Sequence, residues 1–234
     1  DAVEEFDHSV GQVLDLLKEL NIEENTIVIV TSDNGPWFEG NACNLRGRKG
    51  QVYEGGYRVP FIIRYPKKLK EHYETSIPAM GIDLLPTLVE EAGLSVPNDR
   101  KIDGLNLFDL LKDTSSTGLA QNRPLFFFHD YSFDALRIGD WKLIESNYSY
   151  NWPIPLEHPN YLTRGFVPKY SPENSDTSIY RLDQWPKLYN LKDDAQESYN
   201  MATRNEKKVD EMQKVLTEFR ADYLENPRGW LKRK

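Results

Sequence analysis

Apolar and polar positions alternate with a helical period at the start of the chain. From Val3 to Leu20, apolar residues recur three or four positions apart, with polar residues between them. A turn at residues 21–25 leads to residues 26–31, a continuous β-branched run. Such runs are typical of parallel strands that are buried on both faces. The pattern predicts an amphipathic helix that covers a sheet and then a buried strand, and residues 60–65 predict a second one.

The pattern changes character near the middle of the chain. Residues 82–93 predict another helix, which Gly93 ends. Residues 112–122 are rich in Ser, Thr and Gly, so we place a boundary there. The segment beyond it is rich in short apolar runs with β-forming residues. The elements predicted there are strands at residues 125–128, 135–138, 141–145 and 187–191 and a helix at residues 204–224.

Composition narrows the class of protein. A length of 234 residues fits one large domain or two small ones, and 39% hydrophobic residues can supply a core. No apolar run approaches the roughly 18 residues of a membrane span. A single cysteine excludes internal disulfides. A net charge of −8 argues against nucleic acid as a partner, so an anionic substrate would need a local basic cluster, which Arg46, Arg48 and Lys49 provide.

Candidate site residues follow the first predicted strand. Asp33 and Asn34 come just after residues 26–31, and ligands of open α/β sheets bind beyond the carboxyl ends of the strands. Carboxylate and amide oxygens are the ligands that hard cations such as calcium prefer. Lys49 follows in a glycine-rich, basic stretch. A pair of oxygen ligands followed by a cation predicts a site for a small oxyanion ester.

A longer match to a known family begins at these residues. Residues 31–36 read Thr-Ser-Asp-Asn-Gly-Pro, and residues 45–60 read Leu-Arg-Gly-Arg-Lys-Gly-Gln-Val-Tyr-Glu-Gly-Gly-Tyr-Arg-Val-Pro. Together they resemble the second signature region of the type I sulfatases, in the alkaline phosphatase superfamily. The resemblance implies an alkaline phosphatase-like α/β fold and sulfuric ester hydrolase activity. It also implies that Asp33 and Asn34 are calcium ligands and that Lys49 is catalytic and binds the sulfate group.

The resemblance continues toward the C-terminus. Residues 135–144 and residues 188–200, the latter with the pattern Lys-Asp-Asp-x-x-Glu-x-x-Asn, resemble the sulfatase C-terminal subdomain, a small antiparallel sheet closed by a helix. It implies that residues 1–120 are the C-terminal part of the large α/β sulfatase domain and that residues 121–234 are this subdomain. His129 ends a predicted strand whose equivalent in the family often borders the substrate cleft. We weigh it as a substrate contact against an ordinary strand-end histidine.

One family feature is missing. The family nucleophile is a Cys or Ser in the pattern Cys/Ser-x-Pro-x-Arg, oxidised to formylglycine. Cys43 lacks both the Pro and the Arg, and Ser95 is followed by Pro97 but has Asp99 where the Arg should stand. We therefore expect this chain to be the C-terminal part of a sulfatase, inactive alone. The formylglycine is then expected in the missing N-terminal part of the same protein.

The stretch of residues 147–186 has little periodicity and is rich in Tyr, Trp and Pro. Long loops of this kind in compact domains are usually functional or disordered. Aromatic faces suit sugar rings, so the partner we expect is a sulfated small molecule or saccharide. The alternative is an insertion packed on the surface.

Three other functions stay open at this point. Phosphonate and phosphodiester hydrolases of the superfamily usually carry Asp-His where this chain has Asp33 and Asn34, so the amide favours sulfate esters. A non-catalytic homologue that holds a sulfated glycan is the second. An unrelated α/β domain that shares an Asp-Asn-Gly turn is the third. The family resemblance favours a periplasmic, secreted or lysosomal location.

Overall fold

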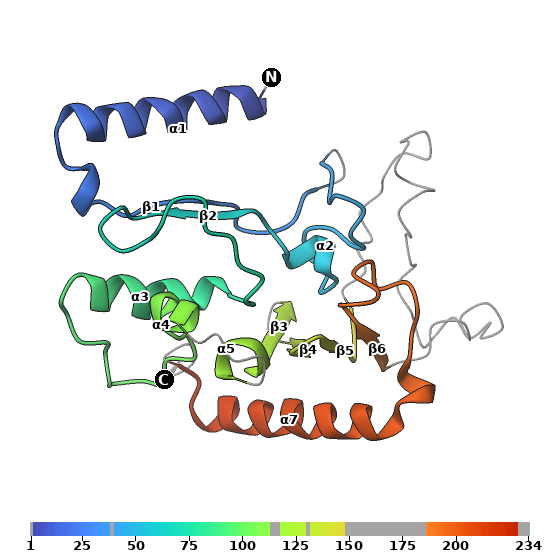
Figure 1. Ribbon diagram of the computed structural model, residues 1–234. Coiled ribbons are helices and arrows are strands. Elements are labelled where there is room, and N and C mark those ends of the chain that lie inside the picture. The colour runs from blue at the N-terminus through green and yellow to red at the C-terminus, as the bar shows by residue number, and fades with distance from the viewer. Residues whose placement is uncertain (1, 38–39, 113–117, 130–131, 148–185, 229–234) are drawn as a thin grey trace, which may run out of the picture. The chain divides into compact units, whose positions relative to one another are not determined.

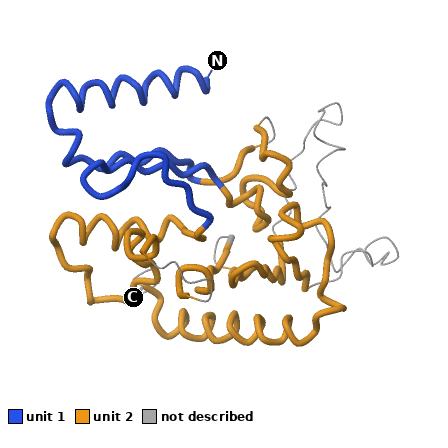
Figure 2. The backbone as a smooth tube through the Cα atoms, viewed as in Figure 1, with its two compact units in different colours: residues 1–33, 59–76 blue, residues 34–58, 77–234 orange. Residues whose placement is uncertain are grey.

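The computed structural model describes residues 2–37, 40–112, 118–129, 132–147 and 186–228. The chain forms two compact units, which Figure 2 shows in different colours. Unit 1 comprises residues 1–33 and 59–76, and unit 2 comprises residues 34–58 and 77–234. The predicted division into residues 1–120 and 121–234 stays a prediction. Most of the predicted loop, residues 148–185, lies outside the described residues.

Unit 1 contains a long helix and a two-stranded ribbon (Figure 1). Its elements are α1 (Ala2–Glu19), η1 (Glu23–Asn25), β1 (Val28–Thr31) and β2 (Phe61–Arg64). The helix and both strands were predicted, but the expectation of a parallel, doubly buried strand is wrong for β1. The two strands are antiparallel, with Val28 opposite Arg64 and Thr31 opposite Phe61. No residue of β1 is fully buried, because a two-stranded ribbon leaves an open edge on each strand.

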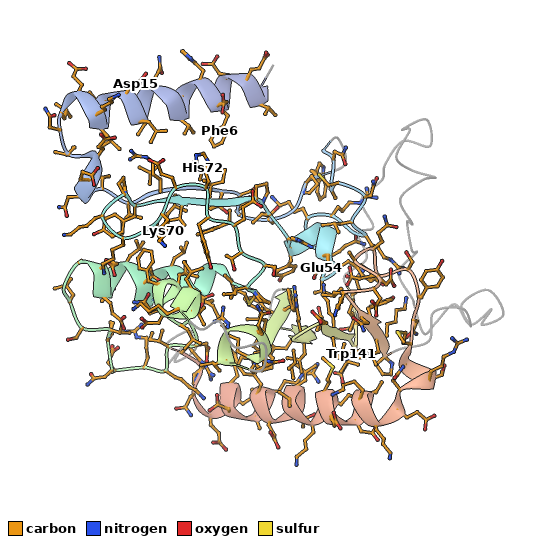
Figure 3. The ribbon with its side chains drawn as sticks, in the orientation of Figure 1. Phe6, Asp15, Glu54, Lys70, His72 and Trp141 are labelled. Atoms are coloured by element: carbon orange, nitrogen blue, oxygen red, sulfur yellow. The ribbon has the colours of Figure 1, made fainter. Side chains whose placement is uncertain are left out.

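The helix α1 is amphipathic, as its sequence predicts, but none of its residues is buried. Phe6 and Asp15 point to opposite sides of the helix (Figure 3). Phe6 is nevertheless 55% exposed. The described ribbon is too small to bury the apolar stripe of an 18-residue helix. The sequence predicted that this helix covers a sheet, and in the structure its apolar stripe is not buried. No described helix has the length and apolar character that crossing a membrane would require.

Unit 2 contains one antiparallel sheet with strand order β3-β4-β5-β6, together with several helices. Its strands are β3 (Leu125–His129), β4 (Ser132–Ile138), β5 (Trp141–Ile144) and β6 (Lys187–Asn190). Its helices are α2 (Glu54–Tyr57), η2 (Gly81–Asp83), α3 (Leu84–Glu91), α4 (Leu107–Lys112), α5 (Leu119–Asn122), η4 (Ala202–Arg204) and α7 (Glu206–Glu225). The four predicted strands, their antiparallel arrangement and the closing helix are confirmed.

One face of this sheet packs against α7, which runs along it (Figure 1). Leu136, Leu143 and Leu188 come from three neighbouring strands and form one buried cluster with Met212 and Leu216 of the helix. Each of these five side chains is at most 1% exposed. Burial of a leucine of this kind stabilises a fold by about 1.5–3 kcal/mol. This face therefore anchors the helix to the sheet.

The opposite face packs against a loop instead of a helix. Successive residues of a strand point to opposite faces, so Ala135, Ile144 and Tyr189 turn away from α7. They form a second buried cluster with Val52 and Tyr53, which precede α2. The loop that the sequence marks as glycine-rich and basic is thus held on the second face of the sheet.

Candidate anion-binding site

The glycine-rich loop, residues 45–57, is tied by its backbone to the residues that follow Asp33. The amide of Lys49 donates to the carbonyl of Pro36 at 3.0 Å, and the amide of Gly35 donates to the carbonyl of Gly56 at 2.8 Å. These bonds fix the main chain at Lys49 from outside the loop. The position of the Lys49 main chain therefore depends also on the segment at residues 35–36.

A tight turn presents Lys49 at the end of the loop. The amide of Gln51 donates to the carbonyl of Arg48 at 2.9 Å, and Gly50, inside this turn, has φ of +84°. Only glycine adopts that conformation without strain. A side chain at Gly56 would overlap the carbonyl oxygens of Gln51 and Arg48. The loop can fold back on itself this closely only because Gly56 has no Cβ.

The three basic residues of the loop do not form one exposed cluster. Arg46 is half-buried, stacks over the ring of Tyr53 at 4.3 Å, and donates from Nη1 to the carbonyl of Glu197 at 2.8 Å. Arg48 is 6% exposed. Lys49 is exposed, and no carboxylate in the described part of the chain pairs with its ammonium. The sequence grouped the three cations together, whereas the structure leaves Lys49 as the one that faces solvent.

A buried ion-pair network lies under the loop, on the sheet face opposite α7. The ammonium of Lys142 is 2.8 Å from Oε1 of Glu54 and 3.1 Å from Oε1 of Glu197. The first contact is a hydrogen bond, whereas the second lacks hydrogen-bond geometry and is an ion pair only. Glu54, labelled on α2 in Figure 3, also has Arg137 at 3.8 Å. One lysine from the sheet thus joins two carboxylates from different segments.

The two carboxylates differ in proton affinity. Burial alone would raise the pKa of Glu54, but the charge and hydrogen bond of Lys142, with Arg137, hold that pKa below its ordinary value. Burial raises the pKa of Glu197, and Lys142 offsets this shift only in part. Glu54 is therefore the firmly ionised partner of the lysine.

Sequence reasoning did not single out Glu54, Lys142 or Glu197. A signal existed for Lys142, because alternation in β5 places it on the same face as Ile144, where an unpaired lysine would be costly. Its carboxylate partners are 88 and 55 residues away in the chain and have no local signal that relates them to Lys142.

The predicted metal ligands lie two and three residues beyond the end of β1. Asp33 is exposed and its Oδ1 accepts a hydrogen bond from Ser32 at 3.4 Å, and Asn34 is half-buried. Their oxygens suit calcium in kind, but calcium takes six to eight oxygen ligands. Among the described residues, no three His, Cys, Asp or Glu side chains gather to hold a metal. The pair fits part of a calcium site and does not complete one.

The remaining predicted residues lie in the four-stranded sheet or just after one of its strands. His129 is the last residue of β3 and is paired with Ser132 of β4, so its strand-end position is confirmed and its contact with substrate stays a prediction. Asn147, where the predicted loop starts, accepts a hydrogen bond from the amide of Val52 at 3.0 Å. The start of the predicted loop is therefore bonded to the glycine-rich loop at Val52, three residues after Lys49 in the sequence.

Comparisons with known proteins point to one family. The profile of the sulfatase family matches residues 1–94, and the profile of the C-terminal region of N-sulphoglucosamine sulphohydrolase matches residues 48–146. Human steryl-sulfatase is 36% identical over 147 residues, which cover 58% of this chain and 25% of that protein. The uncharacterized sulfatase YdeN of Escherichia coli K12 is 30% identical over 233 residues, covering 93% and 39%.

Solved structures give the same result. A sulfatase of Bacteroides thetaiotaomicron, from a locus for the metabolism of multiple glycosaminoglycans, superposes with a TM-score of 0.68 at 25% identity and covers 92% of this chain and 43% of that one. This chain belongs to the sulfatase family, with an alkaline phosphatase-like fold. It spans 25% of human steryl-sulfatase and 39% of YdeN.

Proposed function

We propose that this chain contributes to the active site of a sulfuric ester hydrolase and that Lys49 binds the sulfate group. The observation that carries the proposal is the exposed ammonium of Lys49 on a turn that a backbone hydrogen bond fixes to Pro36. A cation held in this way costs little reorganisation when an anion binds. It stabilises the negative charge that develops on the ester oxygens as the S–O bond breaks.

We propose further that Asp33 and Asn34 contribute oxygen ligands to a calcium ion. Calcium, when bound, supplies positive charge beside the sulfate oxygens. The support is the chemistry of these two side chains and their place just beyond β1. Because two ligands are far fewer than calcium needs, we expect calorimetric titration of this chain to give weak calcium binding or none. Submicromolar affinity would contradict the assignment of an incomplete site.

The nucleophile is inferred to come from outside these 234 residues. The sequence has no Cys or Ser followed by Pro at the second and Arg at the fourth position, and Cys43 is followed by Leu45 and Gly47 there. We therefore expect this chain alone to release no sulfate. We infer a periplasmic, secreted or lysosomal location from the family resemblance alone.

The substrate we propose is a sulfated saccharide. The aromatic-rich residues 147–186 begin at Asn147, which is bonded to Val52 close to Lys49 in sequence. Flat aromatic faces suit sugar rings. The similarity to a sulfatase from a glycosaminoglycan locus supports the same class. A steryl sulfate is the second candidate, which the 36% identity with human steryl-sulfatase favours.

Replacement of Lys49 in the full-length gene product tests the proposal. Lys49→Ala should lower kcat/KM for a small aryl sulfate by about 10²–10³, the usual loss for one charge-stabilising donor. The unfolding midpoint should not change, because the side chain is exposed. Lys70→Ala, another exposed lysine, is the matched control and should keep normal turnover. Normal turnover by Lys49→Ala would contradict the assignment of Lys49 as the sulfate-binding residue. Faster cleavage of aryl phosphonates than of aryl sulfates by the wild type would favour a phosphonate hydrolase instead.

A further inference from the structure

We propose that Glu197, from the turn after β6, is the positioning residue that holds both ends of the glycine-rich loop and so sets where Lys49 stands. The proposal rests on the proposed role of Lys49. Glu197 is fully buried, with 0% of its surface exposed. Sequence reasoning assigned no role to it beyond a family-like pattern at residues 188–200.

The side chain of Glu197 holds the C-terminal end of the loop. Its Oε2 accepts the amide of Glu54 at 2.6 Å, and this amide begins α2 and has no partner within that helix. Its Oε1 lies 3.1 Å from the ammonium of Lys142, which in turn bonds Glu54 at 2.8 Å. Glu197 therefore holds the main chain of Glu54 directly, through the amide, and its side chain indirectly, through Lys142.

The main chain of Glu197 holds the N-terminal end. Its carbonyl accepts Nη1 of Arg46 at 2.8 Å, and the same guanidinium donates to the hydroxyl of Tyr189 at 3.3 Å. The two ends then meet, because the amide of Gly55 donates to the carbonyl of Arg46 at 2.6 Å. Lys49 lies between these clamped ends.

The backbone of Glu197 is in a conformation that glutamate rarely adopts. Its φ is +54°, in the left-handed region where a Cβ atom crowds the backbone. The surrounding turn holds it there. The carbonyl of Asp194 accepts the amide of Glu197 at 3.1 Å, and the carboxylate of Asp194 accepts the amides of Ser198 at 3.0 Å and Tyr199 at 2.8 Å. Strained residues that their surroundings hold in place are typical of functional sites.

The same turn is fixed to the sheet. Oδ1 of Asn200 accepts the amides of Leu188 at 3.0 Å and Ala202 at 3.0 Å, and the amide of Met201 donates to the carbonyl of Leu188 at 2.8 Å. The three residues of the pattern Asp-x-x-Glu-x-x-Asn together hold this turn between the sheet and the glycine-rich loop. Asp194 shapes the turn, Asn200 attaches it to β6, and Glu197 reaches the loop.

Two variants of Glu197 in the full-length gene product test the proposal. Glu197→Ala removes the acceptor for the Glu54 amide, whereas Glu197→Gln keeps an oxygen of the same reach. Amide hydrogen exchange of peptides from residues 45–57, read by mass spectrometry, should accelerate at least tenfold in Glu197→Ala and less than threefold in Glu197→Gln. Exchange in α7 should not change in either variant. Asp193→Ala, an exposed neighbour, is the matched control and should exchange as the wild type does.

Turnover of a small aryl sulfate gives the second readout. We expect kcat to fall at least tenfold in Glu197→Ala with KM changed less than threefold, and Glu197→Gln to recover most of kcat. Unchanged exchange in residues 45–57 of folded Glu197→Ala would overturn the proposal, as would accelerated exchange across the whole protein in both variants. If Lys49→Ala keeps full turnover while Glu197→Ala still loosens the loop, the proposed function fails and the positioning of the loop stands.

Discussion

Arg123 and Asp83 form a two-pronged ion pair in the interior of unit 2, with Nη1 of the arginine 2.7 Å from Oδ1 of the aspartate. Asp83 is 0% exposed and Arg123 is 5% exposed. The aspartate also accepts the amides of Met80 at 2.8 Å and Leu105 at 2.9 Å. One carboxylate thereby joins α5, the start of α3 and the segment before α4.

This relationship predicts a large loss of stability on removal of the arginine. Arg123→Met leaves a buried carboxylate without its cation, which costs roughly 3–5 kcal/mol of unfolding free energy. Urea denaturation measures it. The double variant with Asp83→Asn should recover part of the loss, since no buried charge then remains. Arg100→Met, which breaks only the exposed pair with Asp99, should leave the urea midpoint unchanged.

The buried network predicts a pH dependence with a definite sign. The pKa of Glu197 is raised above 4.5, so between 4.5 and that pKa the folded state binds more protons than the unfolded state. The unfolding free energy must therefore fall as pH rises through this window. The pKa of Glu54 is lowered, so its contribution is present above 4.5 and is lost as pH falls below it.

Glu197→Gln should remove the first of these effects. Thermal unfolding at about pH 5 and about pH 7 should give a smaller difference in stability for the variant than for the wild type, because the glutamine does not titrate. Lys192→Gln, an exposed change of one charge in the same turn region, serves as control and should keep the wild-type difference. An undiminished difference in Glu197→Gln would mean that another group causes it.

Close backbone contact predicts opposite outcomes for two glycine substitutions. Gly56→Ala places a methyl group against the carbonyl oxygens of Gln51 and Arg48, and overpacking of this kind costs about 1–3 kcal/mol. Gly11→Ala lies inside α1 with open space around it and should stabilise the helix by roughly 0.5–1 kcal/mol. Thermal unfolding of the two variants checks the pair. Equal effects would contradict the closeness of the loop.

The aromatic-rich segment predicts a split between substrates. Replacing residues 148–185 by a short Gly-Ser linker in the full-length protein should spare cleavage of a small aryl sulfate and abolish action on a sulfated saccharide. The reason is the anchor of Asn147 on Val52, which starts this segment beside the glycine-rich loop. Initial rates on both substrates measure the effect, and equal losses on both would indicate a folding role instead.

Local patterns predicted the elements better than their partners. The apolar stripe from Val209 to Tyr223 predicted α7, and the short apolar runs predicted β3 to β6. The spacing of apolar residues along the chain reflects which face of a helix or strand is buried, so it can be recognised within a short segment. The run at residues 26–31 predicted a strand correctly and its direction wrongly. A β-branched run favours an extended strand, but it carries no information on which segment pairs with that strand or on how much of it becomes buried.

The candidate site divides in the same way. The glycine-rich, basic loop that carries Lys49 was predicted because turn chemistry is local, and the role of Lys49 stays a prediction. The roles of Arg46 and Glu197 were missed, since each depends on a contact 151 residues away in the chain. Charge alone suggested that Arg46 faces a substrate, whereas its carbonyl partner and the ring of Tyr53 hold it inward.

The alternation along β5 also has a consequence for how mutations at this strand are tolerated. Leu143 contacts the helix side and Lys142 the loop side, although the two are neighbours in sequence. A saturation scan of the full-length gene product that measures cellular abundance and sulfate release separately should find a period of two in β5. Substitutions at Leu143 should reduce both quantities in proportion, whereas conservative ones at Lys142 should lower the activity per molecule. Adjacent codons in this strand are then under different kinds of selection.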